Sequence, residues 1–166
     1  MLSLLAAIAM TTAAPEDEVL DRIDDFFIAL YQADTEALGA MMDDELQLYT
    51  LRKRPGRAKF EEVRGTREGF LAGLEGQEKK INEVYWDAKV QISPAGLATV
   101  WVPYYLEYEG APLHCGIDAF TLVKGEAGWR ITNIHDTRDP EGCERLGKDE
   151  AKGRMRPAKL VKLLKN

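Results

Sequence analysis

The sequence has no apolar run that approaches the roughly 20 residues of a membrane-spanning helix, and its 166 residues include only two cysteines and two histidines. It has no Gly-rich nucleotide loop, no serine elbow and no paired-cysteine metal motif. It also lacks internal repeats and low-complexity segments. These absences argue against a transmembrane segment, a repeat protein, a nucleotide-dependent enzyme and a zinc domain, and no cofactor is predicted.

The charge is unevenly distributed along the chain. Residues 144–166 hold eight bases and three acids, or +5, which leaves −11 on residues 1–143 within the net −6. An acidic body repels nucleic acid, so no nucleic-acid partner is expected. We interpret 144–166 as a frayed, flexible basic tail. In the alternative, residues 157–166 form amphipathic turns that touch acidic lipid or the acidic body.

The first 14 residues resemble a secretory signal peptide. An apolar block from Leu2 to Met10 is followed by small residues up to Ala14 and then by acidic residues. No Lys or Arg precedes the block, and the alternative is a buried first turn of helix. We predict cleavage after Ala14 and an exported protein, periplasmic or extracellular.

Hydrophobic periodicity indicates helices first and strands afterwards, in a domain over residues 15–143. A stripe at three- and four-residue spacing runs from Val19 to Tyr31, Asp34 can cap a second helix, and Thr66 a third. Leu46, Leu48 and Thr50 alternate as in a strand, and residues 52–64 are expected to form a loop. After Gln77 the period becomes two, and strands are predicted at residues 81–92, 98–108, 113–124 and 129–137. This order favours an α+β fold.

Several local strings resemble the nuclear transport factor 2-like superfamily. They are residues 27–38 (FIALYQADTEAL), 65–70 (GTREGF), and 114–124 (HCGIDAFTLVK) followed by 128–131 (GWRI). The last pair is similar to the closing hairpin of a bacterial exported branch. The resemblance implies three N-terminal helices packed in the concave face of a strongly bent antiparallel sheet, a conical cavity and often a homodimer.

The superfamily also contains ketosteroid isomerases, SnoaL-like polyketide cyclases and scytalone dehydratase. Aligned on the Ala33-Asp34 break, the isomerase's oxyanion-binding Tyr falls on Phe26 and its Asp base on Thr50. Phenylalanine donates no hydrogen bond, and threonine is not a base at neutral pH. Isomerase chemistry of that type is therefore disfavoured.

The last hairpin carries the polar residues expected in the cavity. If Lys124 faces Trp129, an unbroken register places Asp118 opposite His135. His114, Asp118, Asn133 and His135 then share the concave face. Asp118 and His135 are candidates for an oriented acid–base pair, and a satisfied structural network is the alternative. Asp136 points to the other face in this register, so no metal is predicted.

The middle strands add candidate ligand contacts at Trp101 and Tyr105, for which core packing or dimer contact is the alternative. Three function classes stay open: a non-catalytic exported domain binding a small, fairly apolar ligand; a lyase, isomerase or cyclase using His135 with Asp118; and a structural dimerisation domain. Whether the protein is an enzyme is left undecided.

The two cysteines are predicted to form a disulfide. In an exported protein two thiols favour one bond, whereas in a cytosolic protein they would be two buried residues. Cys115 begins a long strand, and in the predicted register it lies opposite Arg138. The five residues from there to Cys143 are enough for the chain to turn back.

Overall fold

The computed structural model describes residues 14–78 and 80–164. The predicted signal segment, apart from Ala14, lies outside the described residues. Three helices come early, α1 (Pro15–Gln32), α2 (Thr35–Met41) and α3 (Arg67–Ala72), and α4 (Ala158–Val161) follows near the end. Within the described part of the chain, no helix combines the length and apolarity needed to cross a membrane.

Local chemistry explains where the early helices begin and end. Helix α1 has a proline in its first turn, followed by three acidic residues. Its C-cap is Ala33, which adopts a left-handed conformation with φ 54°. Asp34 caps α2 by accepting from the Ala37 amide at 2.9 Å, and Thr66 caps α3 by accepting from Gly69 at 3.1 Å. The three predicted helices are confirmed.

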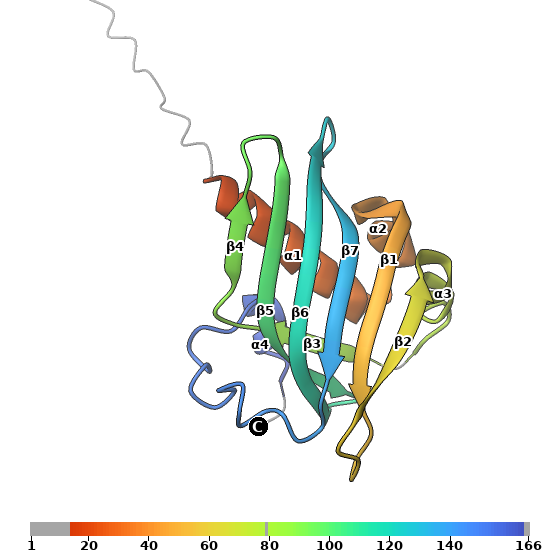
Figure 1. Cartoon of the computed structure of the whole chain (residues 1–166), viewed down its shortest axis with the longest axis vertical. Coiled ribbons are helices and arrows are strands. Elements are labelled where there is room, and N and C mark those ends of the chain that lie inside the picture. The colour runs from red at the N-terminus through yellow and green to blue at the C-terminus, as the bar shows by residue number, and fades with distance from the viewer. Residues whose placement is uncertain (1–13, 79, 165–166) are drawn as a thin grey trace, which may run out of the picture.

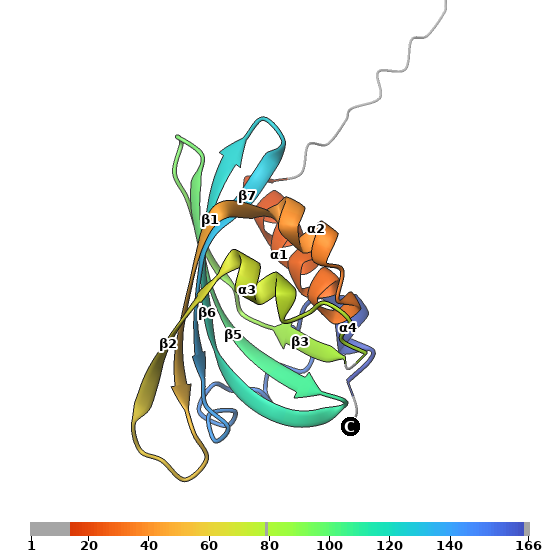
Figure 2. The same ribbon diagram turned by 90° about the vertical axis from the view of Figure 1, so that its right-hand side faces the viewer.

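Seven strands form one curved sheet. They are β1 (Met42–Lys53), β2 (Phe60–Thr66), β3 (Ile81–Tyr85), β4 (Lys89–Ile92), β5 (Leu97–Tyr108), β6 (Ala111–Gly125) and β7 (Gly128–Arg138). The order is β2-β1-β7-β6-β5-β3, and β4 also pairs with β5. Figures 1 and 2 show the sheet bending around α1, α2 and α3, which lie on its concave side. The α+β class is confirmed, but β1 and β7 run parallel, so the sheet is mixed.

Two strands differ from the sequence prediction. Residues 60–66 form β2, although residues 60–64 were expected within a loop and residues 65–66 at the start of the third helix. All seven residues of β2 are exposed. An edge strand exposed on both faces shows no alternation of apolar and polar residues, so periodicity could not reveal it. The strand predicted at 81–92 is broken between β3 and β4, where Asp87 has a positive φ of 44°.

The basic C-terminal segment is packed against the body, so the prediction of a frayed, flexible tail is wrong for its described part. Ala151, Met155 and Leu160 are buried. The Trp86 indole donates to the Leu146 carbonyl at 3.1 Å. Arg156 forms an ion pair with Asp24 of α1 at 2.8 Å. Further along, α4 forms with Leu160 buried, which agrees with the alternative of turns against the body for residues 157–164.

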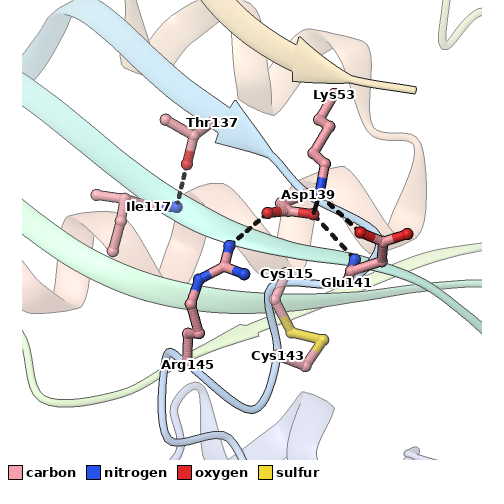
Figure 3. Close-up of polar contacts among 8 residues, drawn as sticks. All are labelled: Lys53, Cys115, Ile117, Thr137, Asp139, Glu141, Cys143 and Arg145. Atoms are coloured by element: carbon pink, nitrogen blue, oxygen red, sulfur yellow. Dashed lines mark hydrogen bonds and ion pairs between the residues drawn. A yellow bond between two sulfur atoms is a disulfide. The ribbon is translucent and has the colours of Figure 1, made fainter. Parts of the chain in front are cut away.

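The disulfide predicted between Cys115 and Cys143 is present and joins this segment to β6. Figure 3 shows a polar cluster beside it. Asp139 accepts from Arg145 Nη2 at 2.5 Å and lies 3.4 Å from Lys53 Nζ. These contacts and the disulfide hold the chain after β7 against the end of the sheet.

Candidate functional site

A cavity of about 490 Å³ opens between the helices and the concave face of the sheet. Most of its wall is apolar and comes from α1, α3 and the sheet, including Phe26, Phe27, Phe70, Leu74, Phe120 and Ile134. Its polar wall residues include Thr50, Glu83, Tyr104, His114, Asp118, Asp136 and Arg138. We refer to this space as the cone cavity.

An irregularity in the β6–β7 hairpin decides which side chains enter the cone cavity. The predicted register holds from Lys124↔Trp129 to Leu122↔Ile131. The register then shifts by one residue, and Thr132 Oγ1 donates to the Thr121 carbonyl at 3.2 Å. Beyond this bulge Asp118 faces Asp136, and His135 faces Ala119. The predicted Asp118–His135 pair is therefore wrong, because one extra residue moves the later side chains to the opposite faces.

Four of the six predicted ligand-contacting residues lie outside the cone cavity. Asn133 pairs with Gln47 at 3.4 Å, and the His135 ring packs edge-on against Tyr49 with centroids 5.8 Å apart. Trp101 is 52% exposed on the convex face. Tyr105 lies next to Tyr104 in β5 and therefore points to the other face of the sheet, away from the cone cavity. The Lys148 ammonium lies 3.9 Å from the Tyr105 ring centroid. His114 and Asp118 line the cone cavity as expected.

The cone cavity contains a buried pair of acids, Glu83 of β3 and Asp118 of β6. Both residues are buried, and each carboxyl group affects the pKa of the other. Burial raises the pKa of Glu83 to about 8 and that of Asp118 well above its usual range. The pair therefore retains a proton at neutral pH, and the protonated carboxyl can donate a hydrogen bond.

Glu83 was not among the residues predicted for the site. The sequence pattern does indicate it, because in a strand of period two Glu83 lies on the same face as Ile81 and Tyr85, whose side chains are largely apolar. A carboxylate on the inner face of a strand is costly to bury, and such residues are candidates for a functional site.

The third acid of the cone cavity, Asp136, has a different environment. One of its oxygens accepts from Thr50 Oγ1 at 2.5 Å and the other from Arg138 Nε at 2.6 Å. The cone cavity therefore holds an acid that is ion-paired to an arginine, beside the buried pair Glu83 and Asp118.

Tyr104 and His114 complete the polar wall. The Tyr104 hydroxyl donates to the Thr137 carbonyl at 2.9 Å, and the same oxygen lies 3.2 Å from His114 Nδ1. Because the hydroxyl hydrogen is engaged, Nδ1 must be the donor to that oxygen. Burial and the nearby Arg138 lower the pKa of His114 to about 4, so its imidazole is neutral at pH 7.

Comparison with known proteins gives matches to solved structures alone. No family model matches the chain, and no curated protein matches it. A nuclear transport factor 2-like protein from Cytophaga hutchinsonii is 19% identical and superposes with a TM-score of 0.62, covering 76% of this chain and all of the other. A putative dehydratase from the same family in Streptomyces avermitilis is 17% identical, with a TM-score of 0.55 over 74% and 94% of the two chains.

The chain has the nuclear transport factor 2-like fold. ActVI-ORFA from Streptomyces coelicolor shares this fold at 18% identity and a TM-score of 0.53, covering 75% of this chain and 96% of the other. These identities establish the common architecture alone, so the function must be argued from the site.

Within this nuclear transport factor 2-like fold, the positions aligned with the ketosteroid isomerase residues carry different chemistry. Phe26 stacks on Phe70 with centroids 6.2 Å apart, in the apolar wall. Thr50 lines the cone cavity and binds Asp136. Among the described residues there is no group of three or more His, Cys, Asp or Glu side chains arranged to hold a metal ion.

A second cavity of about 570 Å³ adjoins the cone cavity, and we call it the outer cavity. The two share Arg52, His114 and Arg138 in their walls. The outer cavity is also lined by Lys53, Arg54, Pro55, Leu113 and Pro140. The largely apolar cone cavity and the basic outer cavity therefore have part of their walls in common.

Proposed function

We propose that this protein binds a small, largely apolar molecule in the cone cavity, with one oxygen atom of that molecule against the Glu83–Asp118 pair. The observation that carries the proposal is an apolar chamber of about 490 Å³ with a pair of buried acids, Glu83 and Asp118, in its wall. Pockets that combine apolar walls with a few convergent polar groups are typical of small-molecule sites.

The acid pair suits a carbonyl or hydroxyl oxygen. A protonated carboxyl donates a hydrogen bond to such an oxygen, and the apolar wall removes the rest of the ligand from water. Phe26, Phe70 and Phe120 supply flat surfaces for an aromatic or alicyclic body.

A pair of isosteric probes tests this proposal. 2-Acetylnaphthalene and 2-ethylnaphthalene have the same ring body, but the first alone accepts a hydrogen bond. We expect calorimetry to find the ketone bound about fivefold to tenfold tighter, the worth of one hydrogen bond. Asp118→Ala with Glu83→Ala removes both carboxyl donors and should abolish that preference.

His135→Gln is the matched control, because it changes a polar residue of the hairpin that does not line the cone cavity. Binding of the ketone should be unchanged in this variant. Absence of binding of both probes to the unmodified protein would contradict the proposal.

A second candidate function is proton transfer to or from the bound molecule, as in a lyase, isomerase or cyclase. It is favoured by the three carboxyl groups in one chamber, the buried pair Glu83 and Asp118 and the ion-paired Asp136. A buried carboxyl with a raised pKa keeps its proton at neutral pH and can act as a general acid. Here Glu83 replaces His135 as the partner of Asp118. A substrate turned over by the protein but not by Asp118→Asn would support it.

We also propose that the protein is exported and that it forms a homodimer. The Leu2–Met10 block and the Cys115–Cys143 disulfide support an exported protein. Leu97, Trp101 and Val123, which are 46%, 52% and 40% exposed on β5 and β6, support a homodimer through the convex face.

A further inference from the structure

Two arginines lie side by side in the wall shared by the two cavities. Arg52 of β1 and Arg138 of β7 are direct partners in the parallel register. Both line the cone cavity and the outer cavity. Like charges opposite each other on neighbouring strands are destabilising. An arrangement that violates a local rule of this kind is characteristic of functional sites.

Both guanidinium groups keep unused hydrogen-bond donors within the described residues. Arg138 donates through Nε to Asp136, and its two terminal nitrogens have no hydrogen-bond partner in residues 14–78 and 80–164. The nearest carboxylate to Arg52 is Glu61 at 3.6 Å, which is longer than a hydrogen bond. Glu61 already accepts from Arg54 Nε at 3.0 Å.

The local charge balance favours an anion. Three arginines, Arg52, Arg54 and Arg138, contact two carboxylates, Glu61 and Asp136. The protonated Glu83–Asp118 pair adds little negative charge near neutral pH. One positive charge therefore lacks a partner at the junction of the cavities.

We propose that Arg52 and Arg138 bind the carboxylate of an organic acid whose apolar body lies in the cone cavity. The planar fork of an arginine matches a carboxylate with two parallel hydrogen bonds, and an anion between two arginines removes their mutual repulsion. This inference rests on the proposed function and specifies its ligand as an apolar organic acid.

The test compares naphthalene-2-acetate with 2-(2-naphthyl)ethanol, which has the same apolar body without the charge. We expect calorimetry at pH 7 to find the acid bound about tenfold tighter or more, as for a hydrogen bond to a charged group. The Arg52→Gln variant should lose most of this preference. Arg52 is half exposed, so the variant is expected to fold, and thermal unfolding checks that it does.

Arg64→Gln is the control, since it removes the same charge from the neighbouring strand β2. The Arg64 guanidinium lies over the Tyr49 ring at 5.3 Å, and Arg64 lines neither cavity. The acid preference should persist in this variant.

Equal binding of acid and alcohol to the unmodified protein would overturn the inference and leave the proposed function standing. An acid preference that survives Arg52→Gln would also overturn it, because the charge recognition would then lie elsewhere. Binding of none of the naphthalene probes would overturn both proposals.

Discussion

At the scale of single residues, Gly116 of β6 has no room for a side chain. A Cβ built at this position would lie 1.7 Å from the Thr137 carbonyl oxygen and 2.7 Å from the Tyr104 ring. The Tyr104 hydroxyl also binds that carbonyl, so a displacement would disturb the polar wall of the cone cavity.

We expect Gly116→Ala to lower the free energy of unfolding by about 3 kcal/mol, the upper range for overpacking. Gly125→Ala, at the end of the same strand with nothing within 4 Å, should change it little. Urea denaturation of both variants measures the difference. Equal stability of the two variants would mean that the strands separate at little cost.

Glu83 makes stability depend on pH. Its folded pKa is about 8, whereas an unfolded glutamate titrates near about 4.3. Between these values the folded state keeps a proton that the unfolded state has lost, so stability falls as pH rises. The folded pKa of His114, about 4, opposes this below about pH 6.5, where the unfolded histidine becomes protonated.

The loss of stability should therefore appear between about pH 6.5 and 8, at up to about 1.4 kcal/mol per pH unit for one proton. Urea denaturation at the two ends of this range measures it. The Glu83→Gln variant should show a smaller loss. If the variant loses as much stability as the unmodified protein, the effect comes from other groups.

At the scale of structural elements, the disulfide holds the C-terminal segment to β6. It closes a loop with a sequence separation of 28 residues, which is worth about 3 kcal/mol in the chain-entropy model. Cys143→Ser should lower the free energy of unfolding by about that amount. The measurement is urea denaturation with and without a reducing agent, and reduction should have no effect on the variant.

At the scale of the whole molecule, the convex face carries the predicted dimer contact. Trp101→Lys should shift a dimer to a monomer, because it places a charge at the centre of an apolar contact. Light scattering at tens of micromolar measures the change. Leu163→Lys is the control, since Leu163 is 46% exposed but lies on the C-terminal segment rather than the sheet. A monomer in the unmodified protein would contradict the prediction.

The proposed export also concerns the whole chain. N-terminal sequencing of the native protein should find Pro15 as the first residue, because small residues at Ala13 and Ala14 precede it. A native protein beginning at Met1 or Leu2 would contradict this prediction.

Short-range patterns explain why much of the fold was predictable. The stripe from Val19 to Tyr31 and the caps at Asp34 and Thr66 depend on neighbours within one or two helical turns. The end of the β6–β7 hairpin depends on a tight turn, so Lys124 opposite Trp129 was also predictable. The sequence alone therefore determined the helices, most of the strands and the α+β class. It also predicted that Cys115 lies close to Cys143.

The tertiary structure decided which side chains enter the cone cavity. A single bulged residue, Thr132, places Asp136 in the cone cavity and His135 outside it. No local sequence pattern predicts such a bulge. Glu83 meets Asp118, and Arg52 meets Arg138, through pairings between distant strands. Such contacts depend on strand order and register over the whole sheet, whereas hydrophobic periodicity reports only which face of one element is buried.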